Sequence, residues 1–124
     1  MIAHWDDVET YRREQGPLGA TWTDLGGAAG AIAVGLHRIQ LAPGEIPTPV
    51  HVHGDVRAGH VVARPAGSGR AHAFRAGEDG LTLLAYGSKE PNDICYYPRS
   101  RKVYLRGVGP IARLEHLDYW DGED

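Results

Sequence analysis

The chain has 124 residues, a length that suits one domain with its own hydrophobic core. Its 13 Lys and Arg residues against 16 Asp and Glu residues give a formal net charge of -3, which argues against nucleic acid or a membrane surface as a partner. A single cysteine, Cys95, excludes an internal disulfide and fits a reducing compartment. The N-terminus has no secretion signal and no apolar run is long enough to span a membrane, so we expect a cytoplasmic protein.

In chain order, the first expected element is a short helix over residues 6–15, with an aspartate available as N-cap and Gly16-Pro17 as a stop. Beyond it, glycines and prolines separate short apolar segments, a rhythm typical of β-sandwiches and barrels. The expected strands cover residues 31–42, 48–54, 60–66, 70–76, 81–87, 94–98, 102–107 and 112–120. The sequence therefore predicts an all-β fold in a single domain over residues 1–124.

Two histidines, His51 and His53, stand one residue apart in the stretch PTPVHVHGDV. Residues i and i+2 of a strand point to the same face, so the two imidazoles would lie close together, as metal ligands do.

Other residues have simpler interpretations. Ser68 fits a turn and Cys95 an apolar contact, while the glycine-rich residues 24–30 lack the lysine and the setting of a phosphate loop. No ligand pattern includes the remaining histidines, His4, His37, His60 and His116.

Two stretches of the chain resemble the paired signatures of the cupin superfamily. In LAPGEIPTPVHVHG, Gly44 is followed after six residues by His51-Val52-His53. In RAGHVVARPAGSGRAHAF, Gly59 is followed after five residues by Pro65-Ala66-Gly67 and then by His72. The likeness, to small single-domain bacterial cupins, covers roughly residues 18–124. It implies a cupin-type jelly-roll β-barrel over residues 18–124, with residues 1–17 as an N-terminal extension.

In cupins of this pattern, the two histidines of the first signature and the one in the second bind a divalent metal inside the barrel. The resemblance thus implies His51, His53 and His72 as ligands of Fe, Mn, Ni, Zn or Cu, with coordination positions left open for a small molecule. Similar proteins include dioxygenases, isomerases, lyases and sugar-binding domains, so the resemblance leaves open whether the protein is an enzyme. Arginines near the second signature would favour an anionic ligand if they point inward: Arg57, Arg64, Arg70 and Arg75.

The chain departs from the cupin pattern after His53. The usual glutamate ligand is absent, and Asp55 is its candidate substitute because it would share a face with His51 and His53 if the strand continues through Gly54. The segment between the signatures is also short by roughly one hairpin, about twenty residues. Natural deletion, engineering or a gap in the recorded sequence would each account for this.

A barrel without one hairpin has open sheet edges, and a homodimer would cover them by strand pairing or strand exchange. The alternative function is that of a degenerate, metal-free cupin, a non-catalytic module that binds a ligand or a partner.

Overall fold

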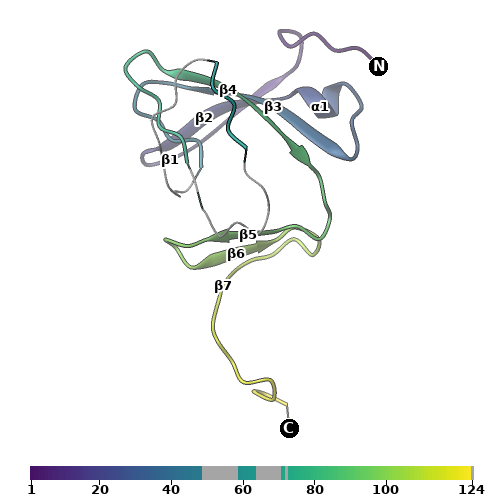
Figure 1. Cartoon of the computed structure of the whole chain (residues 1–124), viewed down its shortest axis with the longest axis vertical. Coiled ribbons are helices and arrows are strands. Elements are labelled where there is room, and N and C mark those ends of the chain that lie inside the picture. Colours follow the sequence, from purple (N-terminus) through teal and green to yellow (C-terminus); the bar gives the residue numbers. More distant parts are fainter. Residues whose placement is uncertain (49–58, 64–70, 72, 124) are drawn as a thin grey trace. The chain divides into compact units, whose positions relative to one another are not determined.

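The computed structural model describes residues 1–48, 59–63, 71 and 73–123. The chain divides into two compact units, Met1–Glu90 and Pro91–Asp124, and each contains one antiparallel sheet (Figure 1). Strands far outweigh helix in the described residues, which confirms the expected β-rich class. Neither sheet closes on itself within these residues, so the jelly-roll barrel stays a prediction, as does the single domain.

The first unit is built on a four-stranded sheet in the order β1-β2-β3-β4, so consecutive strands are hydrogen-bonded neighbours. Its strands are β1 (Thr10–Gln15), β2 (Leu18–Asp24), β3 (Val34–Leu41) and β4 (Leu81–Ser88). Register is continuous across the sheet, with Tyr11 opposite Trp22, Trp22 opposite Ile39 and Ile39 opposite Leu83. Between β2 and β3 lies α1 (Leu25–Ala28), one turn that begins where the Asp24 carboxylate accepts a hydrogen bond from the Gly27 N–H.

The predicted helix over residues 6–15 is wrong, because Thr10–Gln15 form β1. An isolated helix of this length is marginal in water. Gly16, with φ of 57°, and Pro17 turn the chain back so that all six residues of β1 pair with β2. The same two residues were interpreted as a helix stop, and β2 itself was not expected.

The later strand predictions have mixed outcomes. β3 and β4 confirm the expected strands at 31–42 and 81–87. Two other expected strands, 60–66 and 70–76, are described only at residues 60–63 and at residues 71 and 73–76. None of these residues lies in a strand, so those two predictions are wrong there. The expected strand at 48–54 lies almost wholly outside the described residues.

One face of the first sheet packs against the chain that precedes β4. The hydrophobic core on this face contains Ala20, Ile39, Leu41 and Ala76, with Trp22, Leu81 and Leu83 packed around them. On the opposite face, the Arg38 guanidinium donates to the Trp5 carbonyl at 3.2 Å and pairs with Asp6 at 3.3 Å. The N-terminal residues therefore shield Arg38, whose side chain is only 14% exposed.

The second unit is a three-stranded sheet in the order β5-β6-β7: β5 (Ile94–Tyr97), β6 (Lys102–Leu105) and β7 (Ile111–Arg113). These strands confirm the expectations at 94–98 and 102–107, whereas the strand expected at 112–120 stops at Arg113. Val103 is the buried apolar residue of this unit. Burial, together with a hydrogen bond to Cys95, raises the pKa of Tyr97 to about 12.

Among the described residues, no helix has the length and apolar character needed to cross a bilayer.

Gly77 and Gly80 form a matched pair in the turn before β4. Gly80 has φ of 75°, and a Cβ there would lie 2.7 Å from the Leu41 carbonyl oxygen, whereas a Cβ at Gly77 would meet nothing within 4 Å. Left-handed backbone costs an L-residue about 1–2 kcal/mol. We therefore expect Gly80→Ala to lower the free energy of unfolding in urea by about 2 kcal/mol and Gly77→Ala to change it by less than about 0.5 kcal/mol. Equal losses in the two variants would contradict this account of the turn.

Candidate functional site

All four predicted metal ligands, His51, His53, Asp55 and His72, lie outside the described residues. So do Arg57, Arg64 and Arg70, while Arg75 is described and exposed to solvent. What the structure describes are the residues that precede His51 and those that follow His72. Within the described part of the chain, no cluster of three or more His, Cys, Asp or Glu side chains is suited to hold a metal ion.

The segment that leads to His51 and His53 begins with a tight turn at the end of β3. Gly44 has φ of 79°, a left-handed conformation that favours glycine, and the Glu45 N–H donates to the Ala42 carbonyl at 3.1 Å. The Glu45 carboxylate closes the turn from the other side by accepting a hydrogen bond from the Ala42 N–H at 2.8 Å. Ile46 then pairs with β2, because its carbonyl accepts from the Gly19 N–H at 3.0 Å.

The segment that follows His72 is attached to the same turn. The Gly44 N–H donates to the Ala76 carbonyl at 3.1 Å, and the Ala76 N–H donates to the Glu45 carbonyl at 3.0 Å. Ala73 and Ala76 are each only 3% exposed, so this segment is anchored by burial as well as by hydrogen bonds. The chain six residues before His51 is thus joined to the chain four residues after His72.

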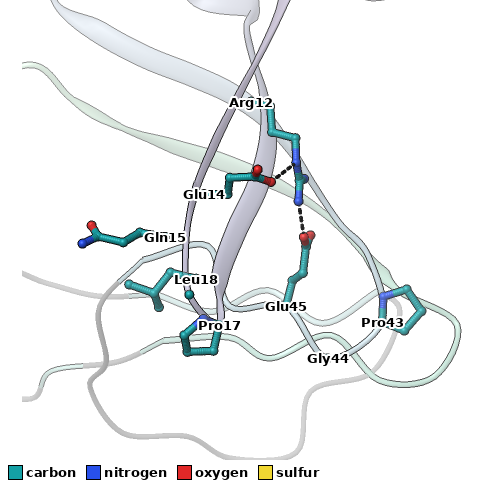
Figure 2. A pocket seen from close by; sticks show the side chains of 9 residues that line it. Arg12, Glu14, Gln15, Pro17, Leu18, Pro43, Gly44 and Glu45 are labelled. Atoms are coloured by element: carbon teal, nitrogen blue, oxygen red, sulfur yellow. Dashed lines mark hydrogen bonds and ion pairs between the residues drawn. The ribbon is translucent and has the colours of Figure 1, made fainter.

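Glu45 also connects the turn to β1 through its side chain. One carboxylate oxygen accepts a hydrogen bond from Arg12 Nη2, and Glu14 accepts from Arg12 Nε at 2.8 Å (Figure 2). The ion pair lies over Gly19, where an added Cβ would come within 2.6 Å of Glu45 Oε1. A larger residue at that position would require the Glu45 and Arg12 side chains to shift.

The ion pair changes the acidity of both partners. Its hydrogen bond to Arg12 holds the pKa of Glu45 below its ordinary value, with a further contribution from the Ala42 N–H. In turn, the hydrogen bonds to Glu45 and then Glu14 raise the pKa of Arg12. The Glu45 side chain is 17% exposed and that of Arg12 is 45% exposed, so water screens part of this interaction.

A cavity of about 660 Å³ opens beside the ion pair (Figure 2). It is lined by Arg12, by residues 14–18 around the β1–β2 turn, and by residues 43–45. Two carboxylates face the single Arg12 cation there, so this cavity does not offer an anion an unpaired positive charge. The predicted anionic ligand is therefore not assigned to it.

The histidines expected to serve no ligand role have varied surroundings. His37 lies 3.7 Å from Asp24 and meets the Trp22 ring edge-on, with 6.1 Å between ring centroids. His4 lies 3.8 Å from Asp6, and His116 is exposed. Sequence reasoning missed the contact between Arg12 and Glu45. The only signal for it was the acidic residue of the Pro43-Gly44-Glu45 turn, because 33 residues separate the partners.

The chain was compared with protein-family models, curated proteins and solved structures, and none of them matches it.

The lowered pKa of Glu45 predicts a specific dependence of stability on pH. In acid the unfolded chain binds the Glu45 proton more readily than the folded chain does, so this stabilisation is present above the ordinary pKa of 4.5 and is lost as pH falls through the lower folded value. We expect Glu45→Gln to lower the melting temperature at neutral pH and to flatten its fall in acid. Thermal melts from pH about 7 to about 3 would measure both.

Glu14→Gln is the matched control, because the Glu14 side chain also pairs with Arg12 but is 68% exposed. It should change the melting profile less than Glu45→Gln does. Parallel profiles for the parent and Glu45→Gln would show that the Glu45 carboxylate does not contribute to the acid dependence.

Proposed function

We propose that this chain is a small cupin-type protein that binds a divalent metal through His51, His53 and His72 and uses the site to bind a small molecule. The observation that carries the proposal is that the chain before His51 and the chain after His72 are hydrogen-bonded to each other at Glu45 and Ala76. A shared site needs its ligands to converge from distant parts of the sequence, and this pair of hydrogen bonds brings the flanks of both segments to one place.

The chain lengths involved are compatible with a common metal. His51 follows Glu45 by six residues and His72 precedes Ala76 by four. An extended chain spans up to about 3.3–3.6 Å per residue, so both segments have enough length to bring imidazoles to one ion. Histidine nitrogens bind zinc-like metals at about 2.0–2.1 Å, which requires the rings to approach within a few ångströms of one another.

The donor set fits a divalent transition metal. Neutral imidazoles suit Fe, Mn, Ni, Zn and Cu, and three of them leave coordination positions open. When bound, such a metal supplies Lewis-acid chemistry to a small-molecule ligand. Asp55 is the candidate for an additional carboxylate ligand. No residue of the sequence stands out as a general base, so the proposal does not specify a reaction.

The absence of the family's glutamate after His53 favours a second candidate function. Without it, the chain would be a metal-free cupin relative that binds a ligand or a partner and carries out no reaction. Folds of this kind host many functions, so metal binding is the property that separates the two candidates.

Metal content separates them directly. We expect tag-free protein to contain about one metal per chain by inductively coupled plasma mass spectrometry, and the double variant His51→Ala/His53→Ala to contain none. His72→Ala should bind more weakly, while His116→Ala, at an exposed position outside the proposed site, should match the parent. A chelator should also lower the melting temperature of the parent, because metal bound only to the folded state stabilises it.

Absence of metal from the parent, even after incubation with Fe, Mn, Ni, Zn or Cu, would reject the metal site and favour the metal-free module. Equal metal content in the parent and the double variant would place the metal on other residues.

A further inference from the structure

The strand β1 contacts the turn after β3 through the Arg12 side chain. Arg12 Nη2 donates a hydrogen bond to Glu45 Oε1, although 33 residues separate the two. The pair passes close over the backbone of β2, because a Cβ added at Gly19 would lie 2.6 Å from Glu45 Oε1 and 3.2 Å from Arg12 Nη2. Gly19 does not have a left-handed φ, so the cost of a side chain there would come from displacing this ion pair.

Glu45 connects this ion pair to the backbone of the turn. Its second carboxylate oxygen accepts a hydrogen bond from the Ala42 N–H at 2.8 Å, and its own carbonyl accepts from the Ala76 N–H at 3.0 Å. Through its side chain and its backbone, one residue therefore links β1, the end of β3 and the chain that follows His72.

All three proposed histidine ligands lie between Glu45 and Ala76 in the sequence. A metal bound by them would order this part of the chain, and ordering costs conformational entropy. Where the two ends of the segment are already held together, metal binding has less of that cost to overcome, and the affinity is higher. The contacts that hold the Glu45 side chain should therefore affect the metal affinity.

We propose that Arg12 and Glu45 are positioning residues for the metal site: their ion pair fixes the base of the histidine-bearing segment and thereby raises the affinity for the metal. This inference rests on the proposed function and extends it to two residues outside the four expected ligands. The Glu45 side chain is 17% exposed and that of Arg12 is 45% exposed, so water screens the pair in part. We therefore expect a coupling at the lower end of the usual range between linked sites, about fivefold in affinity.

The affinity of the full chain for Zn²⁺, measured by competition with a chromophoric chelator, tests the proposal. Glu45→Gln and Arg12→Gln should each weaken Zn²⁺ binding by about fivefold, while the saturated variants still hold about one Zn²⁺ per chain. The two substitutions change the net charge in opposite directions, so long-range attraction of the cation would weaken binding in one and strengthen it in the other. A loss of affinity in both variants is therefore specific to the ion pair.

Two further variants test the geometry of the pair. Gly19→Ala leaves every charge in place but crowds Arg12 and Glu45, and should also weaken Zn²⁺ binding, whereas Gly77→Ala, where a Cβ meets nothing within 4 Å, should match the parent. Arg12→Lys keeps a cation that can donate to Glu45, so it should bind Zn²⁺ more tightly than Arg12→Gln.

Controls separate positioning from charge and from stability. Glu14→Gln removes a carboxylate from the same guanidinium at a side chain that is 68% exposed, and its affinity should stay within about twofold of the parent. Ile39→Val removes one carbon from the core of the same sheet and lowers stability while it leaves the ion pair in place. It should bind Zn²⁺ as the parent does at a temperature where circular dichroism shows both to be folded.

The outcomes distinguish this inference from the proposed function. If the parent binds Zn²⁺ and Glu45→Gln and Arg12→Gln bind it equally well, the positioning role is overturned and the metal site stands. A gain of affinity in Arg12→Gln, or an equal loss in Ile39→Val, would overturn the role too, because charge or general stability would then account for the effect. A parent that binds no Zn²⁺ would reject the metal site and this inference together.

Discussion

The Pro43–Ile46 turn is the constraint on which the first unit depends, and Glu45 makes most of its contacts. The Glu45 carboxylate accepts hydrogen bonds from the Arg12 side chain of β1 and from the Ala42 N–H at the end of β3. Its carbonyl accepts from the Ala76 N–H, and the next residue, Ile46, binds β2. Apart from the bond to Ala42, these contacts join residues that are distant in the sequence. Together they join two strand ends, one edge strand and a distant segment at one point.

This arrangement gives the proposed metal site its physical basis. Histidines from two signatures meet more readily when the flanks of their segments are held together, because closing the long loop between them costs conformational entropy. The hydrogen bonds between Glu45 and Ala76 and the burial of Ala76 in the core offset part of that cost. The side chain of Glu45 contributes by fixing the turn.

Sequence reasoning predicted the strands whose patterns are strongest and missed those decided by distant partners. β3, β4, β5 and β6 were expected because apolar, β-branched and aromatic residues fill them between clear turns. β1 was expected to be a helix because Gly16 and Pro17 fit a helix stop as well as a hairpin turn, and only pairing with β2 distinguishes the two. The contact between Arg12 and Glu45 depends on the assembled sheet, and the acidic residue in the Pro43-Gly44-Glu45 turn does not by itself identify its partner. The histidine ligands stay a prediction from spacing and resemblance.

Pulsed electron paramagnetic resonance on the copper-loaded protein would test most directly whether the two histidine-bearing segments meet, because it counts the imidazoles bound to Cu(II). The account predicts three imidazoles in the parent and two in His72→Ala, with His51 and His53 still bound. The same number in both proteins would contradict it, since the segment after the second signature would then contribute nothing to the metal.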